Sequence, residues 1–366
     1  MCEISWLTAE DKFFNDHAEE MRSAGVPVPR CFVIWKSVPV SCFPCCFSTY
    51  NTFICCASQP DWQSCLVMEN VASQGYNSKQ FFTVVRIEEA RAAMRVAAKI
   101  HALYWAPSGC LPKDAAPTAM YPVYMFTHPM LDGMKKTFSP TDPKCVDQVC
   151  TDWEHEQPIF GRTDVKEMLH ALRARARANS KRANQIHQTH NTMVHGDFHA
   201  GNLMFKGAAT GSSSSSDADG DGVPDLKVID WQMFGSGNCC VELAYFMNAV
   251  VEPVRDTDMA LLKEYHACLQ DVLGEERLLG GEYTFDAFWR DWAVVCLDWC
   301  AAIMARKYKV DTPKKVKERE AMNEGYRKKR RALDSLDERL VERCLWIHTH
   351  HYDEFFTAGG DASSVK

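Results

Sequence analysis

One short stretch limits what this chain can fold into more than any other. It reads His195-Gly-Asp197-Phe-His-Ala-Gly-Asn202 and sets an amide five positions after a carboxylate. Short apolar runs with β-branched and aromatic residues flank it at Thr192–Val194 and Leu203–Phe205, and runs of this kind predict strands. The pattern therefore predicts a strand–loop–strand unit with Asp197 and Asn202 in the loop.

A second carboxylate follows on the next predicted strand, where Asp230 ends the run Lys227-Val-Ile. Phosphoryl transfer from ATP needs a carboxylate near the acceptor hydroxyl and oxygen ligands that hold Mg²⁺ on the phosphates. Protein kinases meet this need with an Asp in a tight loop, an Asn five residues later and a second Asp on the next hairpin. The alternative to a functional role for Asp197 is an ordinary solvated loop carboxylate, which the spacing and the flanking strands disfavour.

By these residues the chain resembles the aminoglycoside phosphotransferase and choline kinase superfamily, whose signature is His-Gly-Asp-x-His-x-x-Asn. The run Ile229–Gln232, with the segments after it, is similar to the ecdysteroid-kinase-like (CHK kinase-like) branch. The similarity continues in other segments, namely Gly235–Gly237, Leu243–Phe246, Leu66–Val71, Ala98–Trp105 and Glu10-x-x-Phe13-Phe14. It spans nearly the whole chain outside two segments of unusual composition.

The resemblance implies a role for each residue of the loop. Asp197 would be the catalytic base or the carboxylate that orients the acceptor hydroxyl, and Asn202 and Asp230 would hold Mg²⁺. His195 and His199 are expected to shape the loop, because Mg²⁺ prefers oxygen ligands to imidazole.

The resemblance also implies a nucleotide site. Glu69, Asn70 and Val71 would form the hinge between two lobes and offer backbone groups to the adenine of ATP. Glu10 would pair with the ATP-binding lysine, and its alternative is an ordinary acidic residue in the first turn of a helix. Together these roles imply a Mg²⁺-dependent small-molecule kinase that transfers the γ-phosphate of ATP to a substrate hydroxyl.

The expected fold class is α+β, a protein-kinase-like two-lobed fold with a truncated N-lobe and a mainly helical C-lobe. The N-lobe would span residues 1–69 and contain an insertion at 37–60, a stretch without charged residues and rich in Cys, Phe, Ser and Pro. The C-lobe would span residues 70–366, with a disordered serine-rich loop at 207–224. Helices are expected at Thr8–Met21, Glu88–Trp105 and Asp164–His190, and strands at Arg30–Trp35 and Cys65–Glu69.

Two positions depart from the family pattern. Only nine residues precede Glu10, which leaves no upstream place for a Gly-rich loop or a strand with the ATP-binding lysine. This favours an alternative function, a catalytically impaired pseudokinase that binds ligands or partners, whereas the intact Asp197, Asn202 and Asp230 favour a kinase with an incomplete gene model. Glu242 stands where the family usually has an aspartate that braces the catalytic loop.

Composition excludes some function classes. The net charge of −7 disfavours a general nucleic-acid binder, which needs a basic surface. No secretory signal opens the chain, and the uncharged stretch Ser37–Pro60 is a poor membrane span. The 17 cysteines are therefore expected to be reduced thiols in a cytoplasmic protein, and zinc binding by those at 31–65 is the minor alternative. The expected partner is a small-molecule hydroxyl substrate, with no nucleic acid, no membrane and no obligate protein partner.

Three weaker motifs each have an ordinary structural interpretation beside a functional one. The run Asp217–Asp225 resembles a calcium loop but lacks the final glutamate, so an acidic hairpin tip is preferred. The basic run Arg327–Arg331 fits a nuclear-localisation patch or, with acidic residues nearby, a solvated helix face. The cluster His348, His350 and His351 has no second group of ligands that would support a metal site.

Overall fold

The computed structural model describes residues 10, 12–36, 48–49, 52–58, 63–80, 83–105, 144–188, 191–206, 224–274 and 283–357. The calcium-like carboxylates before residue 224 and the serine-rich loop up to that residue lie outside the described residues. Thr8, expected to cap the first helix, lies outside them as well.

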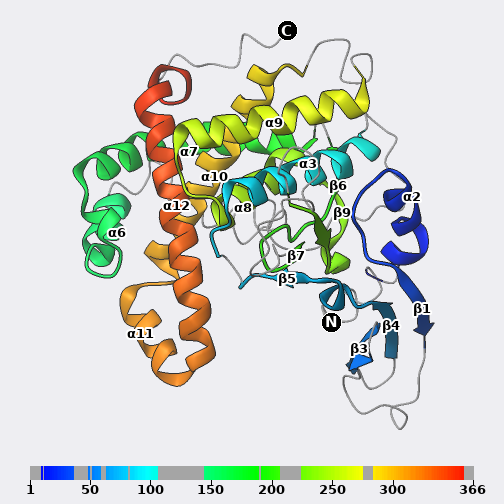
Figure 1. Cartoon of the computed structure of the whole chain (residues 1–366). Coiled ribbons are helices and arrows are strands. Elements are labelled where there is room, and N and C mark those ends of the chain that lie inside the picture. The colour runs from blue at the N-terminus through cyan, green and yellow to red at the C-terminus, as the bar shows by residue number, and fades with distance from the viewer. Residues whose placement is uncertain are drawn as a thin grey trace, which may run out of the picture.

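The N-terminal part combines helical turns with a small sheet, seen at the lower right of Figure 1. Residues 12–16 and α2 (Ala18–Ser23) are helical, with a break at His17 inside the single helix expected here. An antiparallel sheet follows in the order β1-β4-β3-β2. Its strands are β1 (Cys31–Lys36), β2 (Ser48–Thr49), β3 (Thr52–Ser58) and β4 (Gln63–Glu69). The two strands predicted from sequence are β1 and β4, and they pair with each other as expected for a hairpin.

The segment predicted to be an insertion supplies β2 and β3. Strand β3 pairs with β4 along the edge opposite β1. The register of β1 and β4 sets Lys36 opposite Ser64, so these two strands would still meet if residues 37–60 were absent. That the segment is dispensable stays a prediction.

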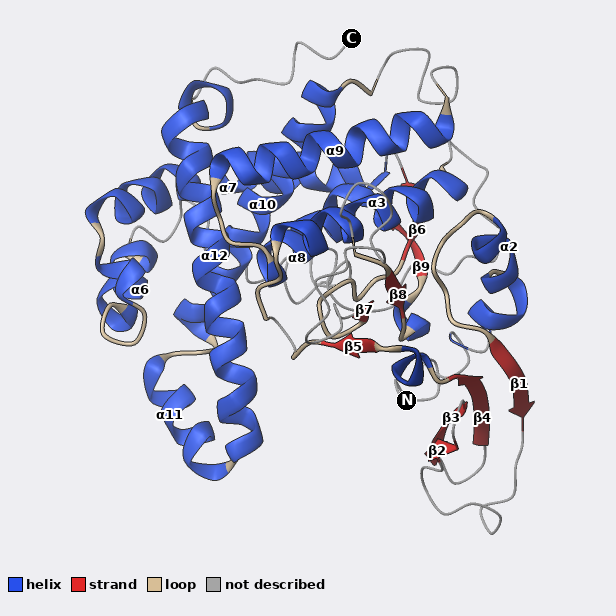
Figure 2. Cartoon of the chain, in the orientation of Figure 1, coloured by secondary structure: helices blue, strands red, loops and turns tan. Residues whose placement is uncertain are grey.

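Two further sheets hold the loop identified from sequence. One has the order β5-β7-β8 and the other pairs β6 with β9, all antiparallel. Figure 2 shows these short red strands between the helices and the N-terminal sheet. Their bounds are β5 (Tyr76–Ser78), β6 (Asn191–Val194), β7 (Leu203–Lys206), β8 (Leu226–Val228) and β9 (Gly235–Asn238). The loop 195–202 therefore passes from one sheet to the other.

Helices dominate the rest of the described chain, which confirms the predicted α+β class with a mainly helical C-terminal part. Every residue of α8 (Cys239–Val250) is buried, so this apolar helix lies at the centre of the core. Helix α3 (Ile87–Leu103) packs on α9 (Arg255–Leu273), and α10 (Phe285–Lys309) packs on α7 (Thr163–Gln188), α8 and α12 (Glu324–Phe355). The remaining elements are α6 (Cys145–Trp153), α11 (Pro313–Met322), η2 (Val71–Gln74), η3 (Pro158–Gly161) and η4 (Trp231–Met233).

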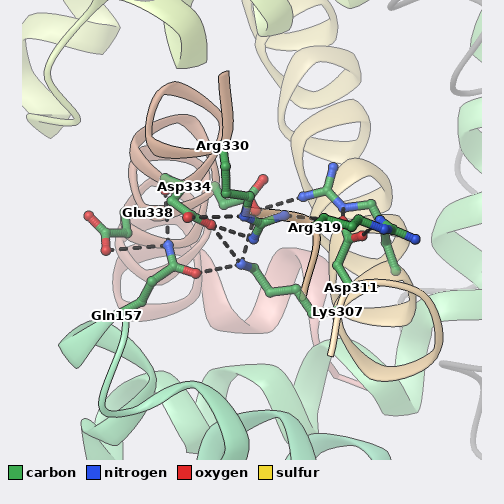
Figure 3. A network of polar contacts seen from close by, with 9 residues as sticks. Gln157, Lys307, Asp311, Arg319, Arg330, Asp334 and Glu338 are labelled. Atoms are coloured by element: carbon green, nitrogen blue, oxygen red, sulfur yellow. Dashed lines mark hydrogen bonds and ion pairs between the residues drawn. The ribbon is translucent and has the colours of Figure 1, made fainter. Parts of the chain in front are cut away.

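A buried ionic network joins the ends of α10, α11 and α12 (Figure 3). Lys307 is 1% exposed, lies 3.1 Å from Asp337 and sits 3.9 Å from the centre of the Trp153 ring. Arg330 is 2% exposed and pairs with Asp311 and Asp334. The prediction of a fully solvated face for the basic run is therefore wrong at Arg330, because the side chain turns inward to these carboxylates.

Three further expectations concern the cysteines, metal sites and membrane-spanning helices. Nine cysteines within the described ranges are free thiols, most of these nine being buried: Cys31, Cys145, Cys150, Cys239, Cys240, Cys268, Cys296, Cys300 and Cys344. No group of three or more His, Cys, Asp or Glu side chains that could hold a metal ion occurs among the described residues, and this includes the histidines of α12. Within the same part of the chain, no helix has both the length and the apolar character that crossing a bilayer requires.

Candidate phosphotransfer site

The loop between β6 and β7 makes a sharp turn that only glycine fits at its second residue. Gly196 has a φ of +84°, and a Cβ there would lie 2.2 Å from the backbone oxygen of Met233. Both the positive φ and the close approach exclude a larger side chain. The loop is thus pressed against η4, the turn that follows Asp230.

Asp197 lies at the centre of a set of hydrogen-bond donors. The Asn202 amide donates to the backbone oxygen of Asp197 at 2.9 Å and to its Oδ2 at 3.2 Å. The Tyr245 hydroxyl donates to Oδ1 at 3.0 Å, and His199 Nε2 lies 3.4 Å from Oδ2. Burial alone would raise the pKa of Asp197, but the interaction with His199 and the other donors lower it below its usual value. The carboxylate is therefore held ionised in one orientation.

The two histidines of the motif hold the loop in shape. His195 Nδ1 accepts a hydrogen bond from the Asp197 N–H, so its proton lies on Nε2, which donates to the oxygen of Ile229 at 2.9 Å. His199 Nδ1 accepts from the Gly201 N–H at 2.9 Å, so Nε2 carries the proton that faces Asp197. These contacts are those of histidines that shape the loop, the role expected from sequence.

Asp230 follows β8 in a left-handed conformation, with a φ of 63°. Aspartate is one of the few residues with a side chain that tolerate this conformation. Burial raises the pKa of Asp230, and the nearby Asp197 carboxylate adds to the rise while the His195 ring opposes it. The Ile229 N–H donates to the backbone oxygen of Asn202, which ties this turn to the loop. The structure thus brings Asp197, Asn202 and Asp230 together, as the sequence predicted.

A buried chain of hydrogen-bonded side chains holds the loop in place. Glu242, at the start of α8, accepts from the Gly196 N–H at 2.7 Å and from His101 Nε2 at 2.9 Å. His101 in turn contacts the Tyr265 hydroxyl through Nδ1 at 2.7 Å. Glutamate at position 242 therefore binds the loop, although the resemblance leads one to expect the shorter aspartate at this position.

The residues predicted for the nucleotide lie on neighbouring elements. Glu69 ends β4, where its carboxylate accepts from the Arg30 N–H and from the Gln74 amide, while Asn70 and Val71 begin η2. Glu10 belongs to the first helical turns and is half-buried. Phe13, one turn further, stacks on Trp231 with 4.1 Å between ring centres. The helical segment of Glu10 is therefore anchored to the residue after Asp230, and none of the contacts described here joins Glu10 or the hinge to Asp197.

Two contacts of the loop were missed by sequence reasoning. Tyr245 belongs to the family-like run Leu243–Phe246, and its spacing of three from Glu242 sets both residues on one face of a helix. Lys79 donates its backbone N–H to the oxygen of Ala200 and pairs with Glu89 at 2.5 Å. No local sequence pattern predicts the contact of Lys79 with the loop, because β5 is brought to the loop by pairing with β7, far along the chain.

The oxygen atoms of the site suit a hard divalent cation. Mg²⁺ takes oxygen ligands such as carboxylates and amide carbonyls. The hydrogen bonds of the Asn202 amide nitrogen to Asp197 turn its carbonyl oxygen away from that carboxylate. Asp230 adds a half-buried carboxylate close enough to Asp197 to interact with its charge. These residues fit the metal that the sequence motif implies.

Comparison with known protein families gives one match that covers most of the chain. The family model for the Ecdysteroid kinase-like family matches residues 19–277. This range includes the loop at 195–202, Asp230 and residues 69–71. A search of the curated proteins gives no match.

Solved structures give more distant matches. A microcompartment-associated aminopropanol kinase is 12% identical with a TM-score of 0.41, and the match covers 96% of this chain and 82% of that chain. A protein described as an aminoglycoside phosphotransferase candidate from Ralstonia eutropha JMP134 is 13% identical with a TM-score of 0.38. That match covers 90% of this chain and 82% of the other.

Proposed function

The chain belongs to the ecdysteroid kinase-like family, and from this premise we propose that it is a Mg²⁺-dependent kinase of small-molecule hydroxyl groups. The observation that carries the proposal is that Asp197 and Asn202 lie on one braced loop and that Asp230 lies close to it. Their residue types and order match the acceptor and metal half of a phosphotransfer site.

In the proposed reaction Asp197 accepts a hydrogen bond from the acceptor hydroxyl and orients it toward the phosphate of ATP. The lowered pKa of Asp197 favours this orienting role over that of a strong base. Asn202 and Asp230 would hold Mg²⁺, which neutralises phosphate charge when bound. Glu69, Asn70 and Val71 are proposed to contact the adenine through their backbone, and Glu10 to contact a lysine of the nucleotide site.

The test is transfer of labelled γ-phosphate from ATP to a panel of alcohols, amino alcohols, sterols and sugars, with Mg²⁺ and with EDTA. We expect transfer to at least one acceptor, abolished by EDTA. Calorimetry with Mg²⁺ and ATP, run in parallel, distinguishes the alternative function. A chain that binds ATP but transfers phosphate to no acceptor would be a pseudokinase, and the proposal would be wrong.

A further inference from the structure

Tyr245 connects the central helix α8 to the carboxylate of Asp197. Its hydroxyl donates to Oδ1 of Asp197 at 3.0 Å, while the residue as a whole is 1% exposed. None of the roles derived from the sequence motif includes this tyrosine. It is nonetheless the described side chain that holds Oδ1.

The donors around Asp197 are distributed unevenly between its two oxygens. Oδ2 faces two donors, the amide of Asn202 at 3.2 Å and Nε2 of His199 at 3.4 Å. Among the described residues, Oδ1 receives a hydrogen bond from Tyr245 alone. An ionised carboxylate offers about two acceptor positions on each oxygen. The acceptor position left over is therefore on Oδ1, beside the tyrosine hydroxyl.

The ring of Tyr245 is fixed on more than one side. It lies 6.1 Å from the Trp299 ring of α10, at an angle of 38°, and 6.2 Å from the ring of His199. Glu242, one turn earlier on α8, binds the loop at Gly196. Helix α8 thus holds both the backbone of the loop and the carboxylate of Asp197, so the hydroxyl of Tyr245 cannot move independently of the loop.

We propose that Tyr245 is a positioning residue, which fixes the plane of the Asp197 carboxylate so that Oδ1 faces the acceptor hydroxyl. The inference rests on the proposed kinase function and deepens it. In a substrate complex, Oδ1 accepts two hydrogen bonds, one from Tyr245 and one from the acceptor. Removing the first leaves the carboxylate held only at Oδ2, so that the position of Oδ1 is less well defined and a smaller fraction of complexes is aligned for transfer.

The test is Tyr245→Phe in the full-length chain, assayed with Mg²⁺, ATP and the panel alcohol that the unaltered chain phosphorylates best. We expect kcat to fall about 10-fold, the rate equivalent of one hydrogen bond to a charged group. The KM values for ATP and for the alcohol should stay unchanged, as should the melting temperature, because the ring and its packing are kept. Tyr352→Phe is the matched control, since that tyrosine of α12 is 46% exposed and should leave kcat unchanged.

The outcomes separate this inference from the proposed function. If the unaltered chain phosphorylates no alcohol, the proposed function fails and the role of Tyr245 falls with it. If the unaltered chain is active and Tyr245→Phe keeps its full kcat, the positioning role alone is wrong. A Phe variant that loses melting temperature and activity together would show that the hydroxyl serves stability, which also overturns the inference.

Discussion

At the scale of single residues, the site depends on a close contact between two backbone segments. Gly196 lies against Met233, one turn after Asp230, so the position of the loop and that of the metal-ligand candidate are set together. A side chain at Gly196 would push the two segments apart. The close contact therefore requires glycine at this position of the motif, whatever family the chain resembles.

We predict that Gly196→Ala destabilises the fold by more than the roughly 1–2 kcal/mol expected for a positive φ alone. The added Cβ would lie 2.2 Å from the Met233 oxygen, a distance that no rotamer can relieve. Gly75→Ala is the matched control, with a left-handed φ of +87° and nothing within 4 Å of the added Cβ. Equal losses of unfolding free energy in the two variants, measured by urea titration, would contradict the close contact.

A second residue-scale prediction concerns the brace. Glu242→Gln keeps the shape of the side chain but places an amide where two donors, Gly196 N–H and His101, need acceptors. Because Glu242 is 1% exposed, we expect a loss of about 1–3 kcal/mol of unfolding free energy. The kinase activity should fall as well. An unchanged urea midpoint would show that Glu242 does not hold the loop.

The sequence predicted the position of the loop better than its surroundings. The spacing and the flanking apolar runs placed Asp197 and Asn202 in one loop between two strands, where their side chains lie 3.2 Å apart. Tyr245 lies 48 positions from Asp197, and only packing of α8 under the loop brings them within 3.0 Å. Local pattern carries no information about such a contact.

At the scale of elements, the ends of α10 and α12 are joined by charge buried in the core. The side chains of Lys307 and Asp337 are fully buried, and Arg306 lies 2.7 Å from Asp337. Buried ion pairs cost desolvation, and the loss of one partner leaves the other charge uncompensated. The helical hairpin of α11 and α12 is thus attached by a network that tolerates no partial loss.

We predict that Lys307→Met lowers the unfolding free energy by about 3–5 kcal/mol, since it leaves Asp337 with fewer compensating charges. Lys317→Met is the control, because Lys317 on α11 is 66% exposed and pairs only at the surface with Glu156. Chemical denaturation of both variants checks this. A Lys307→Met chain as stable as the control would show that the network contributes specificity and not stability.

The same network predicts a pH dependence. Burial alone would raise the pKa of Asp337, but the charges of Arg306, Lys307 and Arg330 lower it below its usual value. A lowered pKa in the folded state adds stability above the unfolded pKa of about 3.9, and this stability is lost as the pH falls further. Lys307→Met should raise the folded-state pKa of Asp337 toward the unfolded value, so the stability lost on acidification should be smaller and the loss should end at a higher pH. Melting curves of both chains, measured from about pH 3 to about pH 6, check this difference. Identical acid profiles of the variant and the unaltered chain would contradict it.

The first helix shows why element boundaries escaped prediction. Sequence favoured one helix through Met21, but the chain breaks at His17, whose ring packs on Tyr104 and Phe234. His17 Nδ1 also lies 3.0 Å from the Tyr104 hydroxyl. Tertiary contacts outweigh the weak preference of a short helix for continuity. The helices α3 and α7, with long periodic patterns, were predicted to within a few residues.

At the scale of the whole molecule, the α+β class followed from the family resemblance, whereas the pairing of the short strands could not be predicted from the sequence. Strand β5 pairs with β7 across more than a hundred residues, and no turn signal links them. The acceptor also stays beyond sequence reasoning, because the helices after Asp230 carry no motif that selects one alcohol.

We predict that a chain lacking residues 37–60 folds with its helical part intact. The antiparallel register of β1 and β4 allows a short hairpin connection, and β3 contributes pairing only at the opposite edge of β4. The expected result is a single cooperative melting transition and unchanged binding of ATP with Mg²⁺. An aggregated or molten chain would show that β2 and β3 are part of the fold.

The central claim is that Asp197 directs the acceptor hydroxyl in phosphate transfer from ATP. The most direct measurement compares Asp197→Asn with the unaltered chain on the best alcohol of the panel, with the exposed Asp256→Asn of α9 as control. We predict a loss of kcat of at least about 100-fold for Asp197→Asn and none for the control. Full activity of Asp197→Asn would contradict the claim.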